Sequence, residues 1–143
     1  MITDASNVSS NDAMPQFHDL KGRTVFVTGG GSGIGATFTR AFTLQGAQVG
    51  FVSLRQERAE LLCDEVEQLA DVRPFYIRCD IRDVAALRTA IEKVRAALGP
   101  ISILVNNAAR DTRHKLESMT VDEWDNSLKT LSLIHISEPT RPY

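Results

Sequence analysis

The sequence predicts an α/β fold in which a parallel β-sheet is covered by helices on both faces. Between residues 23 and 130, short apolar segments of strand length alternate with longer segments whose apolar residues recur at helical spacing. Such alternation with short loops is typical of βαβ units, and right-handed crossovers between parallel strands place helices on both faces. A chain of 143 residues is long enough for one domain with one sizeable core.

The first half of the chain contains two predicted strand–helix pairs. The strands are residues 23–28 and 49–52, and Val25–Val27 is continuously apolar, as expected for a strand buried on both faces. Gly46 is predicted to end the first helix. The apolar stripe of that helix consists of Ile34, Phe38, Ala41 and Phe42. The stripe of the second helix consists of Ala59, Leu62, Val66 and Leu69.

The second half repeats the pattern with strands at residues 74–77 and 101–105. The helix between them ends at Gly99-Pro100, and its apolar stripe consists of Val84, Leu87, Ile91, Val94 and Leu98. Thr120, with Glu123 three residues later, forms a capping box that predicts the start of a fourth helix carrying Trp124 and Leu128.

Composition excludes several classes of protein. A net charge of −2 gives no basis for binding nucleic acid or an anionic membrane, and no apolar run reaches the roughly 20 residues of a membrane helix. The polar N-terminus has no apolar signal core, so we expect a cytoplasmic protein whose residues 1–18 are a disordered leader. Cys63 and Cys79 lack metal-ligand spacing, so we expect reduced thiols and no metal site.

The loop after the first predicted strand is rich in glycine, from Thr28-Gly29 through Ser32 to Gly35. Gly29 permits a tight turn, Gly33 lets the backbone approach a pyrophosphate, and Gly35 allows close packing of helix on strand. The helix that begins here offers free N–H groups to phosphates. A flexible turn and a methyltransferase loop are alternatives at this point, whereas a P-loop is excluded because no Gly-Lys-Ser/Thr follows.

Three motifs together resemble the short-chain dehydrogenase/reductase family over about residues 19–130. The glycine loop is similar to the family's TGxxxGxG fingerprint, and Asp80-Ile81 looks like its adenine-contacting pair. The segment 106–109 resembles the family's NNAG, with Ala109 in place of the final glycine. Taken alone, Asp80 could equally cap the third helix, and Asn106 and Asn107 could be turn residues. The combination disfavours these readings and the methyltransferase.

The resemblance implies a Rossmann-type, doubly wound parallel sheet, truncated here after about four strands, that binds NAD or NADP. The cofactor-binding residues that it implies are Thr28, Gly29, Ser32, Gly33, Ile34, Gly35, Ser53, Asp80, Ile81, Asn106, Asn107 and Ala108. Relatives that prefer NAD have an acidic residue where this chain has Ser53. Arg55 could contact a 2′-phosphate or be an ordinary exposed helix residue, so the choice of cofactor stays open.

Within the family, the chain looks most like the aldose 1-dehydrogenases of the D-xylose type. Residues 20–23, 29–33, 78–80 and 106–116 carry this likeness, and residues 111–114 are its distinguishing part. The likeness implies substrate contacts from Arg113 and His114, which could also lie in a solvated loop. The intact parent protein is then expected to be a homo-oligomer that oxidises an aldose at C1 to a lactone. A ketoreductase of the 3-oxoacyl type and a fragment that only binds a dinucleotide are the alternatives.

The resemblance weakens towards the end of the chain. Leu131 stands where the family has its catalytic asparagine, and neither Tyr76 nor Tyr143 has a lysine four residues later, so we expect no catalytic residue and no activity in this chain alone. Residues 131–143 begin with the in-frame translation of a transposase adapter used in sequencing libraries, so we expect a non-native tail; a divergent native terminus is the alternative. Finding the same codons in the source locus would refute this expectation.

Overall fold

The computed structural model describes residues 15–109 and 119–136 of the chain. In these ranges it contains a short 3-10 helix (His18–Leu20) and then four strands and four α-helices in alternation. Their bounds are β1 (Thr24–Thr28), α1 (Gly33–Leu44), β2 (Gln48–Ser53), α2 (Gln56–Ala70), β3 (Phe75–Arg78), α3 (Val84–Leu98), β4 (Ile101–Asn106) and α4 (Val121–Ile136). Every strand and helix expected from the sequence is present, so the predicted α/β fold is confirmed.

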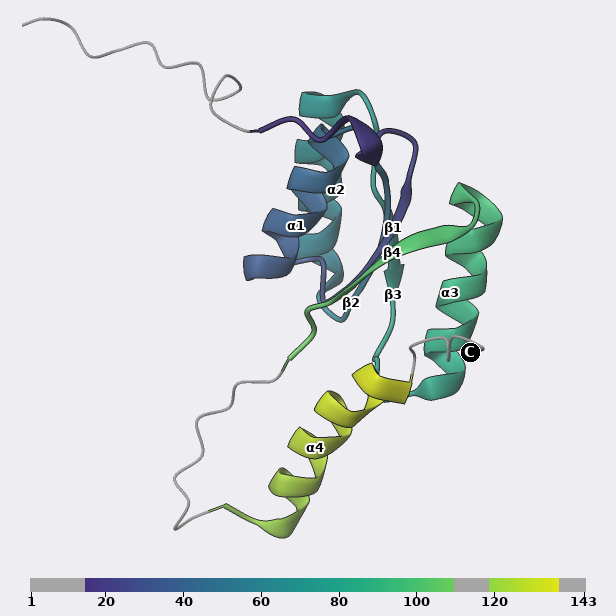
Figure 1. The fold of residues 1–143 in the computed structure, drawn as a ribbon. Helices are drawn as coiled ribbons and strands as arrows, with labels where there is room; N and C mark the ends of the chain where they lie inside the picture. The colour runs from purple at the N-terminus through teal and green to yellow at the C-terminus, as the bar shows by residue number, and fades with distance from the viewer. Residues whose placement is uncertain (1–14, 110–118, 137–143) are drawn as a thin grey trace, which may run out of the picture.

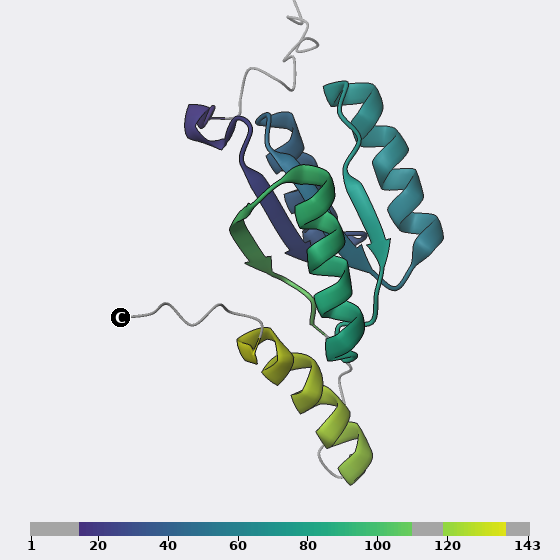
Figure 2. The same ribbon diagram turned by 90° about the vertical axis from the view of Figure 1, so that its right-hand side faces the viewer.

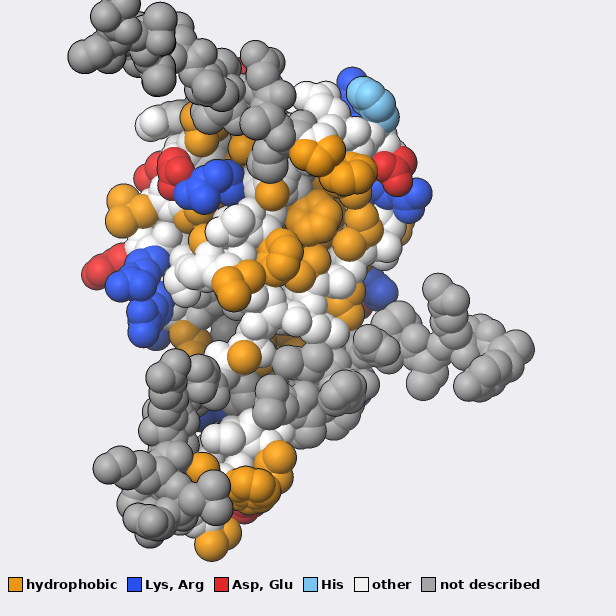
Figure 3. Space-filling model, turned by 60° about the vertical axis from the view of Figure 1, so that its left-hand side comes forward, with side chains coloured by type: hydrophobic (Ala, Val, Ile, Leu, Met, Phe, Trp, Pro, Cys, Tyr) orange, Lys and Arg blue, Asp and Glu red, His pale blue; other side chains and the backbone are white. Residues whose placement is uncertain are grey.

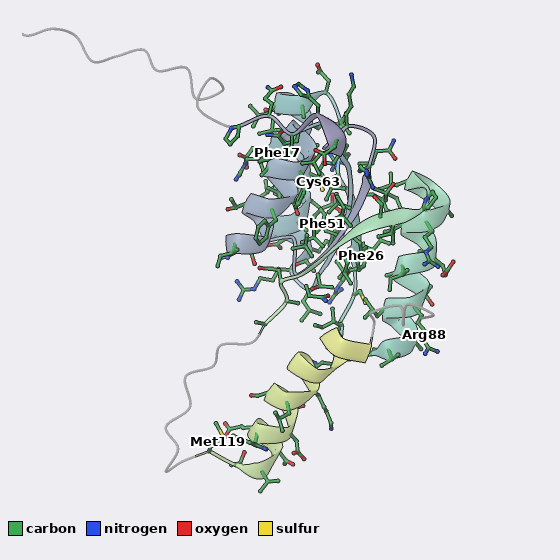
Figure 4. All side chains as sticks on the ribbon, in the orientation of Figure 1. Phe17, Phe26, Phe51, Cys63, Arg88 and Met119 are labelled. Carbon is green, nitrogen blue, oxygen red and sulfur yellow. The ribbon has the colours of Figure 1, made fainter. Side chains whose placement is uncertain are left out.

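The four strands form one parallel sheet in the order β3-β2-β1-β4. Helices α1 and α2 cover one face and α3 covers the other (Figure 1). Because successive side chains of a strand point to opposite faces, the core has two parts. Phe51 packs with Cys63 between the sheet and α2, whereas Phe26 packs on the α3 side (Figure 4).

Helix α1 buries only part of the expected stripe: Ala41 and Phe42 are half-buried, and Phe42 packs against the core. Ile34 and Phe38, placed on its apolar stripe by the sequence, are 71% and 39% exposed. The residues buried instead are Gly35, Thr39 and Thr43. The hydroxyl of Thr39 donates to the carbonyl of Gly30 at 3.0 Å, so the buried polar group is satisfied.

The reason for this change is how closely α1 approaches the sheet. Small side chains are needed where a helix begins directly beside the glycine loop, and bulky ones are displaced outward. Figure 3, which brings the α1 side forward, shows several hydrophobic side chains at the surface.

The prediction for α2 is right at Ala59, Leu62 and Val66, which are buried, and wrong at Leu69, which is exposed.

Residues just before the 3-10 helix are held by the side chain of Gln45, at the end of α1. The side chain of Gln45 donates to the carbonyl of Pro15 at 3.0 Å and accepts from the amide of Phe17 at 2.9 Å. These two bonds fix residues that the sequence had assigned to the end of a disordered leader. Residues 1–14 lie outside the described part of the chain.

The C-terminal part of the described chain is β4 followed by α4. Strand β4 is at the edge of the sheet, and α4 extends away from it (Figure 2). The predicted capping box is confirmed, because Glu123 accepts from the amide of Thr120 at 2.8 Å and donates its own amide to the Thr120 hydroxyl. Helix α4 runs through residue 131, so the expected tail begins within a helix. Among the described residues, no helix is long and apolar enough to cross a bilayer.

Candidate functional site

The carboxyl ends of all four strands lie side by side at one end of the sheet. Residue pairing places Thr28 at the end of β1 beside Val52 of β2 on one side and Asn106 of β4 on the other. Ser53 then pairs with Arg78 at the end of β3. In open parallel sheets, ligands bind just beyond the carboxyl ends of the strands, at the point where the strand order reverses. The order β3-β2-β1-β4 reverses at β1, so the glycine loop after β1 lies at the switch point.

The hydroxyl of Thr28 joins the ends of β1 and β4. Its oxygen accepts from the backbone amides of Asn107 and Ala108, each at 3.1 Å, and donates to the carbonyl of Val105 at 3.5 Å. Two accepted bonds and one donated bond use the full capacity of a hydroxyl. Thr28 is buried, so its side chain acts here as a connection between two loops.

Asn107 strengthens the same connection through its side chain. Its amide nitrogen donates to the carbonyls of Thr28 and Gly29, both at 3.2 Å. The sequence had assigned Asn107 to the cofactor, but the structure gives its amide group a role in holding the glycine loop against β4. Asn106 differs: its Oδ1 is buried and has no hydrogen-bond partner among the described residues.

The glycines of the loop have separate physical roles. Gly29 has a φ of 69°, and a Cβ there would lie 3.0 Å from Cα of Ala108. A Cβ on Gly35 would overlap the carbonyl oxygen of Gly29, so Gly35 allows the first turn of α1 to lie against the loop. Gly33 has a φ of 55° and open space where its Cβ would be. At Gly33, therefore, no described protein atom excludes a side chain.

The packing of the loop on β2 requires glycine at positions 30 and 31, which sequence reasoning missed. A Cβ on Gly30 would lie 2.6 Å from Cβ of Phe51, and one on Gly31 would lie 2.7 Å from Oγ of Ser53. Both glycines therefore bring the loop into contact with the end of β2. The signal in the sequence was the unbroken run of three glycines, which exceeds what the phosphate fingerprint itself needs.

The N-terminus of α1 is not capped by a side chain. Ser32 occupies the N-cap position in an extended conformation and makes no side-chain capping bond, and the first turn carries no acidic residue. The start of α3 is different, because Asp83 accepts from the amide of Ala86 at 3.0 Å. The unpaired N–H groups of a helix start, together with the helix dipole, attract anions. The start of α1, where Ile34 is exposed, therefore offers unpaired N–H groups to an anion.

A cavity of about 330 Å³ lies beside the glycine loop. Residues from the ends of all four strands line it: Gly29, Val52, Ser53, Leu54, Arg55, Cys79, Asp80, Ile81, Arg82, Ala108 and Ala109. Burial raises the pKa of the Cys79 thiol, so this group stays neutral near pH 7. Ser53 and Ile81 are buried, and the apolar side chains of Val52, Leu54, Cys79, Ala108 and Ala109 share the lining with the polar Arg55, Asp80 and Arg82.

Asp80 does not cap α3, the alternative that the sequence left open, since Asp83 does. Its carboxylate is instead held by Arg82, and these hydrogen bonds keep the pKa of Asp80 below its usual value. Sequence reasoning missed Arg82, whose only signal is its position two residues after Asp80. The expected substrate residues Arg113 and His114 lie outside the described part of the chain.

The Thr28 hydroxyl offers a direct test of the connection between β1 and β4. Thr28→Val keeps the shape but leaves the two amides of Asn107 and Ala108 without their acceptor, so we expect a loss of about 2 kcal/mol in the free energy of unfolding. Thr28→Ser keeps the hydroxyl, and its loss should stay below about 1 kcal/mol. Urea denaturation of the three proteins measures the difference. Equal losses in the two variants would show that the hydroxyl bonds contribute nothing.

The short chain dehydrogenase family matches residues 23–137 of this chain. A probable galactose dehydrogenase from Rhizobium meliloti is 47% identical over 121 residues, which are 85% of this chain and 47% of that protein. A D-xylose 1-dehydrogenase from Caulobacter vibrioides is 40% identical over 112 residues, or 78% of this chain and 43% of that protein. The chain thus spans less than half the length of these relatives.

Solved structures agree with the sequence relatives. The crystal structure of a dehydrogenase/reductase from Sinorhizobium meliloti superposes with a TM-score of 0.75 at 36% identity, covering 82% of this chain and 48% of the other. The sequence resemblance rested on the glycine loop, Asp80-Ile81 and residues 106–109, and the structure places the glycine loop at the switch point of the sheet. This chain belongs to the short-chain dehydrogenase family.

Proposed function

We propose that NAD or NADP binds at the carboxyl ends of the strands. The observation that carries the proposal is the start of α1, where an uncapped helix N-terminus meets the open space at Gly33. A pyrophosphate there would accept from backbone N–H groups and interact favourably with the helix dipole. The cavity beside the loop then suits the adenosine part, because apolar residues line it together with a few polar ones.

Two further features fit a dinucleotide. The buried Oδ1 of Asn106 is an acceptor with no partner among the described residues, and such a group costs free energy until a donor reaches it. Ser53 and Arg55 both line the cavity, so we place the adenosine ribose beside them. When bound, the nicotinamide ring would supply hydride-transfer chemistry; the residues of this chain would bind and orient the dinucleotide.

For the longer parent protein we propose an NAD(P)-dependent oxidation of an aldose at C1 to a lactone. The support is the likeness to proteins named as galactose and D-xylose dehydrogenases, together with Arg113 and His114 in the polar segment after β4. A sugar needs many fixed hydrogen-bond partners, and losing one of them leaves a polar group unpaired. A ketoreductase of the same family is the second candidate, since the cofactor motifs are common to both.

Gly33 and Gly22 form a matched pair for testing the phosphate site. Both have positive φ, 55° and 74°, and neither has a described atom within 4 Å of an added Cβ. Alanine at either position should therefore cost a similar backbone strain of about 1 kcal/mol. Only Gly33→Ala should also weaken NAD(H) and NADP(H), by at least tenfold in calorimetric titration, because its Cβ enters the phosphate site. Equal affinities in the two variants would place the pyrophosphate elsewhere.

The choice between the two cofactors is tested at Ser53. Ser53→Asp should raise the ratio of NAD to NADP affinity by roughly tenfold, because a carboxylate accepts from the ribose diol and repels a 2′-phosphate. Arg55→Ala should weaken NADP alone. Arg95→Ala, on an exposed helix position paired with Glu92, serves as the control. An unchanged ratio in Ser53→Asp would mean that Ser53 does not face the ribose.

The substrate proposal is tested in an intact enzyme, made by joining residues 1–130 to the second half of a family member. We expect faster turnover of pentoses or hexoses than of 3-oxoacyl thioesters. We also expect a clear loss of the aldose rate in His114→Ala, since its hydrogen bond to the sugar would be missing. Faster turnover of thioesters would favour the ketoreductase. If His114→Ala leaves the aldose rate unchanged, His114 does not contact the sugar.

A further inference from the structure

Helix α1 contains three threonines, and one of them donates its hydroxyl to a group outside the helix. A threonine within a helix commonly donates to the carbonyl four residues earlier. Thr37 and Thr43 do so, to the carbonyl of Gly33 at 3.4 Å and to that of Thr39 at 2.8 Å. Thr39, which is fully buried, donates instead to the carbonyl of Gly30 in the glycine loop, at 3.0 Å. Its hydroxyl therefore holds the loop rather than its own helix.

Gly30 is held through both of its backbone polar groups. Its amide donates to the carbonyl of Val52 at 3.2 Å, and its carbonyl accepts from Thr39. The peptide that joins Gly30 to Gly31 is planar and trans, so the N–H of Gly31 points in the opposite direction to the carbonyl of Gly30. Because Thr39 holds that carbonyl towards the buried face of α1, the N–H of Gly31 is turned away from the interior.

The amide of Gly31 is a donor that the protein itself does not use. Among the residues that the structure describes, it has no hydrogen-bond acceptor. Gly31 lies against the end of β2, since a Cβ added to it would be 2.7 Å from Oγ of Ser53. Ser53 in turn lines the cavity beside the loop. An unpaired N–H in this place is suited to an acceptor oxygen of a bound molecule.

We propose that Thr39 is a positioning residue for the dinucleotide. Its hydroxyl fixes the peptide between Gly30 and Gly31 so that the N–H of Gly31 donates to an oxygen of the bound molecule. Packing alone does not require a hydroxyl at this position, because valine has nearly the same shape and buries no polar group. The inference rests on the proposed binding of NAD or NADP, and it adds a buried residue that acts on the ligand only through the loop.

The experiment is calorimetric titration of the full chain and its variants with NADH and NADPH. Thr39→Val keeps the shape and removes the hydroxyl, so the affinity for both dinucleotides should fall about tenfold. Thr39→Ser restores the hydroxyl and should bind within about twofold of the wild type. Thr43→Val is the matched control, because it removes a hydroxyl from the same buried face of α1 that donates only within the helix. Its affinities should equal those of the wild type.

Backbone amide chemical shifts separate positioning of the loop from a general effect on the fold. At saturating NADH, the amides of Gly31 and Gly33 should both shift in the wild type. In Thr39→Val the shift at Gly31 should be largely lost while that at Gly33 remains, since the start of α1 is unchanged.

Three results would overturn the role of Thr39. They are wild-type affinity in Thr39→Val, an equal loss of affinity in Thr43→Val, and a failure of Thr39→Ser to restore binding. If the wild-type chain binds neither dinucleotide, the proposed function itself fails and this inference falls with it. Far-ultraviolet circular dichroism of each variant shows that the comparison is made between folded proteins.

Discussion

The hydrogen bonds of the Thr28 hydroxyl are the contact on which the site depends. They join the ends of β1 and β4, and the amide of Asn107 adds two more bonds across the same junction. Because the glycine loop begins at Thr28, this junction fixes where the loop leaves the sheet. The start of α1 and one side of the cavity are positioned as a result.

Close backbone contact is the second constraint, and it explains the run of glycines. Gly29 and Gly35 let the loop pack on itself and on Ala108, while Gly30 and Gly31 let it pack on the end of β2. Each of these positions lacks room for a side chain within the protein. Gly33 is the exception, because the space beside it is open. The loop is thus packed tightly against the protein at these four glycines and is open at Gly33, the first residue of the uncapped helix α1.

The sequence predicted the fold because it depends on local signals. Strand-length apolar segments, helix stripes and the glycine loop can be recognised without knowing their neighbours. The exposed face of α1 could not be predicted this way, since Thr39 and Thr43 are buried only because the helix lies so close to the sheet. The pairing of Asp80 with Arg82 and the bonds from the Asn107 side chain to the glycine loop depend on side-chain geometry, which no spacing reveals. Arg113 and His114 stay predictions from the resemblance.

The most direct measurement is the change in backbone amide chemical shifts when NADP(H) is added to the chain. The account predicts changes at residues 29–35, 80–82 and 106–108, where the strands end. It predicts none at the hollow near the opposite end of the sheet, lined in part by Gln16, Gly46 and Val72. Changes confined to that hollow, or no changes at saturating dinucleotide, would contradict the central claim that the strand ends form a dinucleotide site.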